Sequence, residues 1–106
     1  MNRLLATFCC AWLAAAAPAL AGDAAAGKEK SKTCAACHGP DGNSQAPDFP
    51  RLAGQHYNYL VKVLSDYKSG ARKNPIMAPQ AANLSRRDIE DLAAFYSQQQ
   101  GLVTKY

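Results

Sequence analysis

The sequence has 106 residues, of which 48% are hydrophobic and 19% are charged, and its formal net charge is +4. This length suits one small domain and excludes a large enzyme core. The Lys and Arg residues are scattered along the chain rather than gathered with aromatic residues in one dense block, which excludes a nucleic-acid binder and indicates a solvated surface or docking to an acidic partner.

The beginning of the chain has the pattern of an export signal. Arg3 gives a positive start, residues 4–17 carry no charge, and Ala19-Leu20-Ala21 is a small-residue cleavage pattern. We therefore expect a cleaved signal peptide over residues 1–21, a single domain over residues 22–106, and export to the periplasm.

An uncleaved membrane anchor is the alternative, since residues 4–22 are uncharged and just long enough to cross a bilayer. Pro18, the many alanines and the cleavage pattern favour removal. Cys9 and Cys10 would then leave with the signal, so the mature domain would hold one cysteine pair. Outside the cytoplasm, free thiols do not persist unless something holds them.

The remaining chain shows no internal repeat and no alternating β-branched pattern, so we predict an all-α domain. Asp23 is the expected N-cap of a first helix that begins at Ala24 and ends within residues 34–38, because Gly39-Pro40 cannot continue it. Residues 39–54 are rich in Gly, Pro and short polar side chains, which predicts a loop.

A second helix is predicted from Gln55 to about Ser69, because apolar residues recur there at helical spacing and Gly70 supplies a C-terminal stop. Residues 71–84 are predicted to be irregular, since Pro75 and Pro79 interrupt any continuous helix.

The last helix is predicted to begin after Ser85, which acts as its N-cap, with Asp88 completing a short capping box. Its apolar residues line one face: Ile89, Leu92, Ala93 and Tyr96. A domain this small rarely obtains more than ~3–5 kcal/mol of stability from its own core. We therefore expect a bound cofactor or metal to fill the middle of the fold.

The strongest chemical signal is Cys34-Ala35-Ala36-Cys37-His38. On a helical turn this spacing places both thiols and the imidazole on one face. The two sulfurs can form thioethers with the vinyl groups of a porphyrin, and His38 is then placed to bind the iron. The motif predicts one covalently bound haem c.

Three other interpretations of the motif are weaker. A zinc site needs four protein ligands, and the only additional soft donor, His56, lies at a spacing unlike common zinc patterns. A thioredoxin-like redox pair expects a βαβ setting, and no strand is predicted. A plain disulfide would leave the small core unexplained.

Several stretches together resemble a class I c-type cytochrome over essentially all of residues 22–106. The resemblance is closest to the short bacterial periplasmic mono-haem type, which is similar to one half of the two-haem periplasmic cytochromes. It implies a small class I fold with about three main helices wrapped around one haem. The stretches are Cys34-Ala35-Ala36-Cys37-His38, Gly39-Pro40-Asp41-Gly42-Asn43, Pro50-Arg51-Leu52-Ala53-Gly54-Gln55, Tyr59-Leu60, Met77-Ala78-Pro79 and Asp91-Leu92-Ala93-Ala94-Phe95.

The resemblance also implies an iron ligand set. His38 would be the proximal ligand and Met77 the distal one, with the Pro50 carbonyl accepting the other imidazole N–H. Met77 is the only methionine after residue 21, and a thioether is a soft ligand that raises the reduction potential. His56 is the rival distal ligand.

In the family, a glycine of the first helix packs against an aromatic residue of the last, here Gly27 against Phe95. Lys30-Ser31 departs from the family, because longer relatives carry a bulky apolar residue there. Arg51 is a candidate partner of a haem propionate. Three tyrosines of the second helix either line the haem pocket or simply pack that helix: Tyr57, Tyr59 and Tyr67.

The function that follows is a monomeric, non-enzymatic one-electron carrier between a quinol-oxidising complex and a terminal oxidase or reductase. Six-coordinate iron has no open position for a substrate, and contact with a membrane is expected only through partner complexes. One alternative is a haem subunit held permanently by a dehydrogenase. Another is a haem sensor or enzyme, which requires that Met77 does not bind the iron.

Overall fold

The structure is a computed structural model that describes residues 22–101, so the predicted signal peptide lies outside the described residues. Within this range the secondary structure is helical and contains no strand, which confirms the all-α prediction. The elements in order are α1 (Ala24–Lys30), the 3-10 helix η1 (Ser31–Thr33), α2 (Ala35–His38), α3 (Tyr57–Ser69), α4 (Met77–Ala82) and α5 (Arg86–Ser97).

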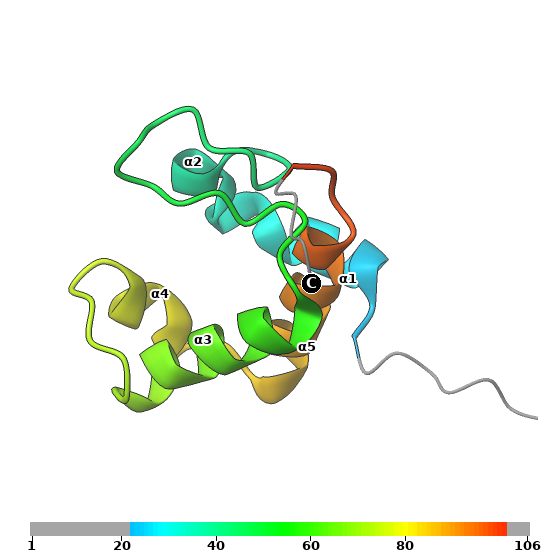
Figure 1. The fold of residues 1–106 in the computed structure, drawn as a ribbon. Coiled ribbons are helices and arrows are strands. Elements are labelled where there is room, and N and C mark those ends of the chain that lie inside the picture. Colours follow the sequence, from blue (N-terminus) through cyan, green and yellow to red (C-terminus); the bar gives the residue numbers. More distant parts are fainter. Residues whose placement is uncertain (1–21, 102–106) are drawn as a thin grey trace, which may run out of the picture.

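The helices form a C-shaped arrangement in the view of Figure 1. α1 packs on α5, α5 packs on α3, and α3 packs on α4. One arm of the C holds α2 and the long loop over residues 39–56, and the other holds α3 and α4. In the described part of the chain, no helix has the length and apolar character needed to cross a bilayer.

The hydrophobic core lies between α3 and α5 and extends toward the inside of the C. Its buried members come mainly from these two helices, and partly buried residues of the other elements pack around them. The buried set is Leu60, Val61, Ile89, Leu92, Ala93, Phe95 and Tyr96; the partly buried set is Cys34, Leu52, Tyr57, Leu64 and Leu84.

The contact between α1 and α5 depends on a glycine. A Cβ atom at Gly27 would collide with the Asp91 carbonyl oxygen and would lie 2.9 Å from the Phe95 Cβ. Only a residue without a side chain lets the two helix backbones approach this closely. The expected packing of Gly27 against Phe95 is confirmed.

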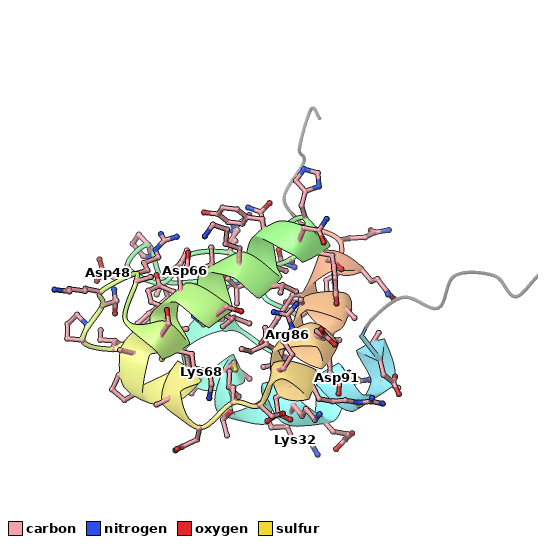
Figure 2. All side chains as sticks on the ribbon, turned by 90° about the horizontal axis from the view of Figure 1, so that it is seen from below. Lys32, Asp48, Asp66, Lys68, Arg86 and Asp91 are labelled. Carbon is pink, nitrogen blue, oxygen red and sulfur yellow. The ribbon has the colours of Figure 1, made fainter. Side chains whose placement is uncertain are left out.

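An ion pair takes the place of the missing apolar residue in the first helix. The Lys30 ammonium lies 2.6 Å from Asp91 Oδ2 and 2.9 Å from Asp88 Oδ1, and the Asp23 backbone N–H donates to Asp91 Oδ1 at 2.9 Å. Asp91 is 2% exposed, and donation by Lys30 holds the pKa of its carboxyl below the usual range. Figure 2 shows Asp91 on α5 with α1 beside it. The carboxylate thereby ties α5 to both ends of α1.

The prediction of one continuous first helix is wrong. α1 ends at Lys30, and the chain passes through a 3-10 turn before α2. The buried Ser31 hydroxyl donates to the Lys28 carbonyl at 2.7 Å, and the Cys34 N–H bonds the Ser31 carbonyl at 2.9 Å, three residues back. A serine hydroxyl that bonds the preceding turn competes with the regular backbone pattern, so the helix tightens here.

The other two long helices agree with the prediction. α3 begins at Tyr57 rather than Gln55 and stops at Gly70, which has a left-handed φ of 84°. The capping box of α5 is confirmed, since Ser85 Oγ accepts the Asp88 N–H and the Asp88 carboxylate accepts the Ser85 N–H. The Ser85 backbone N–H, together with Lys30, lowers the pKa of Asp88 to about 2.

The prediction that residues 71–84 are irregular throughout is also wrong, because they contain α4. Pro79 is the third residue of this helix, where a backbone N–H has no helical acceptor, so its missing N–H costs nothing. The Asn74 side chain starts the helix, because its Oδ1 accepts the N–H groups of Ile76 and Met77, both at 2.9 Å.

Candidate functional site

One cleft occupies the inside of the C. It has two parts, with volumes of about 220 Å³ and about 260 Å³, and both parts share residues from α2, from the loop before α3, and from α3 and α4. The opening between the two arms in Figure 1 is where these elements face each other. The shared lining residues are Thr33, Cys34, His38, Pro50, Tyr67, Met77 and Gln80.

The imidazole of His38 is fixed by the loop that follows it. His38 is the last residue of α2, is 6% exposed, and lies with Nδ1 2.8 Å from the Pro50 carbonyl oxygen. A carbonyl only accepts, so Nδ1 carries the proton in this contact. The Phe49 ring meets the imidazole edge-on, with centroids 6.5 Å apart. This arrangement leaves the Nε2 lone pair available to a metal.

The two cysteines of the motif lie on one helical turn, as the spacing predicts. The N–H groups of Cys37 and His38 both bond the Cys34 carbonyl, at 3.2 Å and 2.9 Å. Cys34 and Cys37 are half-buried free thiols, so the disulfide alternative has no support in the structure. Cys34 lines both parts of the cleft and Cys37 lines the larger part.

Met77 faces the same cleft from the opposite arm. It is the first residue of α4 and is half-buried. Asn74 holds its backbone, and the Lys68 ammonium donates to the Ala82 carbonyl at 3.0 Å, which satisfies the other end of the short helix. The role of Asn74 was missed in the sequence, although Asn-Pro is a recognised turn signal.

The remaining sequence-predicted residues divide into two groups. Arg51, Tyr59 and Tyr67 line the cleft. Tyr57 does not line it and instead packs against the core, which is the second of its two expected roles. His56 is exposed and is absent from the cleft lining, which gives no support to its role as rival ligand.

Tyr96 is a cleft residue that the sequence did not single out for the site. Its helical spacing predicted only core packing, and it lines the smaller part of the cleft. Its hydroxyl is buried without a hydrogen-bond partner among the described residues, and burial raises the pKa of its phenol. The Tyr57 hydroxyl, which lies outside the cleft lining, is buried without a partner as well.

The chemistry of the cleft fits a haem. It brings together two free thiols, one oriented imidazole and one thioether, within walls built largely from Leu, Val, Ala and Tyr side chains. These are the groups that attach a porphyrin covalently and bind its iron.

Comparison with known proteins also identifies a haem protein. A family profile described as Cytochrome c matches residues 24–100. The chain is 46% identical over 99 residues to cytochrome c4 of Pseudomonas aeruginosa, a match that covers 93% of this chain and 49% of that protein. It is 49% identical over 83 residues to cytochrome c-554(548) of Halomonas halodenitrificans, which covers 76% of this chain and 100% of that protein.

The fold also matches a solved structure. Reduced recombinant cytochrome c4 from Pseudomonas stutzeri superposes with a TM-score of 0.73 at 48% sequence identity, covering 77% of this chain and 48% of that chain. The present chain spans about half the length of the cytochrome c4 relatives that it matches. The chain belongs to the cytochrome c family, with the class I fold and covalently bound haem c.

Proposed function

We propose that this chain is a periplasmic one-electron carrier whose haem is attached through Cys34 and Cys37 and ligated by His38 and Met77. The observation that carries the proposal is that His38 and Met77 line the same cleft from opposite arms of the fold. The bound haem supplies an iron that alternates between the ferrous and ferric states.

The contribution of His38 is orientation. Its Nδ1–H donates to the Pro50 carbonyl at 2.8 Å, and this contact sets both the tautomer and the direction of the ring. A ring fixed in this way would hold its Nε2 in one direction toward a bound iron. Pro50 can hold this position because its own φ is fixed by the pyrrolidine ring.

The contribution of Met77 is occupancy of the distal side. Its thioether is a soft ligand that favours the reduced metal, and Asn74 together with the first turn of α4 restricts its movement. If His38 and Met77 both bind the iron, the haem would have no open position for a substrate. This supports a carrier rather than an enzyme or a sensor.

Arg51 and Tyr59 contribute to the smaller part of the cleft. Arg51 follows the Pro50 carbonyl that orients His38, and its guanidinium is the proposed partner of a haem propionate. Tyr59 is 50% exposed, so it lies at the cleft margin.

The proposed domain begins at Gly22, after removal of a signal peptide over residues 1–21. A Cβ at Gly22 would collide with the Glu90 carbonyl, and the Asp23 backbone N–H bonds Asp91, so residues 22 and 23 pack on α5 and belong to the domain. The proposed partners are a quinol-oxidising complex and a terminal oxidase or reductase.

The test replaces Met77 with Ala in the haem-loaded protein. The thioether-to-ferric-iron absorption band should disappear, the reduction potential should fall, and the ferrous variant should bind carbon monoxide, which the wild type should resist. Ile76→Ala is the matched control, because it removes the neighbouring exposed side chain and no ligating atom. Ready binding of carbon monoxide by the ferrous wild type at neutral pH would overturn the carrier proposal in favour of the sensor or enzyme.

A further inference from the structure

The two parts of the cleft differ in charge. The smaller part is lined by Arg51 and Arg72, and its lining residues include no carboxylate. The larger part is lined by Asp48, and its lining residues include no Lys or Arg. The cleft therefore has one cationic side, which we call the arginine side.

Most other cations of the described chain already have partners. Lys30, Lys32, Lys62 and Arg86 form ion pairs, and Lys68 donates to a backbone carbonyl. Figure 2 shows Lys32, Lys68 and Arg86 on different parts of the molecule. Within residues 22–101 no ion pair involves Lys28, Arg51, Arg72, Lys73 or Arg87, and of these five only Arg51 and Arg72 line the cleft.

Arg72 is held in place without being neutralised. Its guanidinium carbon lies 5.2 Å from the centroid of the Tyr67 ring, and its backbone N–H bonds the Asp66 carbonyl at 3.0 Å just beyond α3. A cation over a ring face is ordered by the ring and keeps its charge. The loss of side-chain freedom on binding a carboxylate is therefore reduced.

An exposed aromatic residue lies on the same side. Tyr59 of α3 is 50% exposed and lines the same part of the cleft as Arg72. Tyr and Arg side chains supply much of the binding energy at protein interfaces, and the planar guanidinium binds a carboxylate with two hydrogen bonds. Together the two residues offer a rigid contact for an acidic surface.

We infer that Arg72 and Tyr59 form a docking surface for an acidic redox protein on the arginine side of the cleft. This inference rests on the proposed electron-carrier function and adds the chemistry of the partner. Arg51 adjoins the histidine-orienting Pro50 and is assigned to the haem, whereas Arg72 is exposed, lies just beyond α3 and lines the same part of the cleft. Arg72 is thereby the cation available to a carboxylate of the partner.

The experiment follows oxidation of the ferrous haem-loaded protein by stopped flow with two complexes of opposite charge. Hexacyanoferrate(III), an anion, takes one electron from each haem and becomes hexacyanoferrate(II); tris(phenanthroline)cobalt(III), a cation, is reduced to cobalt(II) in the same way. At low ionic strength, Arg72→Gln should slow the reaction with the anion about threefold to fivefold, and the difference should vanish at high salt. The reaction with the cation should not slow.

Two further variants sharpen the result. Lys73→Gln removes an adjacent exposed charge outside the cleft and should change the rate with the anion less than about twofold. Arg72→Lys keeps the charge and should restore most of the rate. Poly-L-glutamate, as an acidic polypeptide, should slow oxidation of the wild type by hexacyanoferrate(III) and should have less effect on Arg72→Gln.

Each contrary outcome has a distinct meaning. Equal rates for wild type and Arg72→Gln, or no competition by poly-L-glutamate, would overturn the docking surface while leaving the carrier intact. A changed reduction potential that fully accounts for the altered rates would overturn it too, because Arg72 would then serve the haem. If neither complex oxidises the ferrous protein, the electron-carrier proposal itself fails.

Discussion

The contact between α1 and α5 is built from the chain's own atoms, whereas the cleft between the two arms is lined by groups that suit a cofactor. Between the helices, Gly27 allows direct backbone contact, and the buried Asp91 carboxylate has donors on both oxygens. In the cleft, the buried Tyr96 hydroxyl has no partner among the described residues, and Met77 stays half-buried. The chain's own atoms therefore satisfy the Asp91 carboxylate, whereas the cleft collects the thiols, the imidazole and the thioether that suit a haem.

Removal of both thiols should have the largest effect, and it acts on the cleft rather than on the contact between α1 and α5. In Cys34→Ser combined with Cys37→Ser, haem should be lost on acid-acetone extraction, and helical circular dichroism should fall because cofactor binding contributes folding free energy. Thr33→Ser, a change beside the motif, is the control. Haem that remains on the double variant through denaturing electrophoresis would contradict covalent attachment at these cysteines.

The helix pair should break when its glycine is replaced. Gly27→Val forces a side chain against the Asp91 carbonyl and the Phe95 Cβ, so the free energy of unfolding should fall by about 1–3 kcal/mol or more. Ala25→Val, on an exposed position of the same helix, should cost only ~0.5 kcal/mol of helix propensity. Denaturant titration of the haem-loaded proteins measures both values, and equal losses would show that the close approach is not required.

Acid should weaken the same helix pair through its carboxylates. The folded-state pKa of Asp88 is about 2, below its ordinary value of 3.8, and that of Asp91 is lowered as well. Depressed pKa values stabilise the fold above the unfolded-state pKa, and this contribution is lost as the pH falls through the folded value. The melting temperature should therefore drop between about pH 4 and about pH 2.

Asp88→Asn should flatten that decline, because the titrating carboxylate of the capping box is gone. Glu29→Gln is the comparison, since the Glu29 pair with Lys32 is exposed and contributes little. A decline of the same steepness in Asp88→Asn and in the wild type would show that other groups govern acid unfolding.

Where local sequence determined structure, prediction succeeded. The capping box at Ser85, the stop at Gly70 and the helical turn of the Cys34–His38 motif each depend on residues a few positions apart. The break at Ser31 was missed because a serine hydroxyl can point to solvent or to the preceding turn, and only burial decides between them. α4 was missed because Pro79 was taken to interrupt a helix rather than to stand in its first turn.

The same division, between features set by local sequence and features set by tertiary contacts, applies to the candidate site. Cys34, Cys37 and His38 follow from spacing alone, whereas Met77 lies far along the chain and came from a family resemblance. Tyr96 was expected only to pack in the core, since helical spacing does not reveal which buried hydroxyl lacks a partner. Its place in the cleft wall depends on how α5 meets the loop, which is a tertiary property.

The smallest expected effect concerns the residue that positions the distal ligand. Asn74→Ala removes the acceptor for the N–H groups of Ile76 and Met77, so stability should fall by about 1 kcal/mol. Because the start of α4 would then be looser, added imidazole should displace the Met77 thioether at a lower concentration, about fivefold lower for the same free energy. Asn83→Ala, at the exposed other end of α4, is the matched control. Titration of the ferric protein with imidazole measures the change, and an unchanged midpoint would mean that the haem, rather than Asn74, holds this arm of the cleft in place.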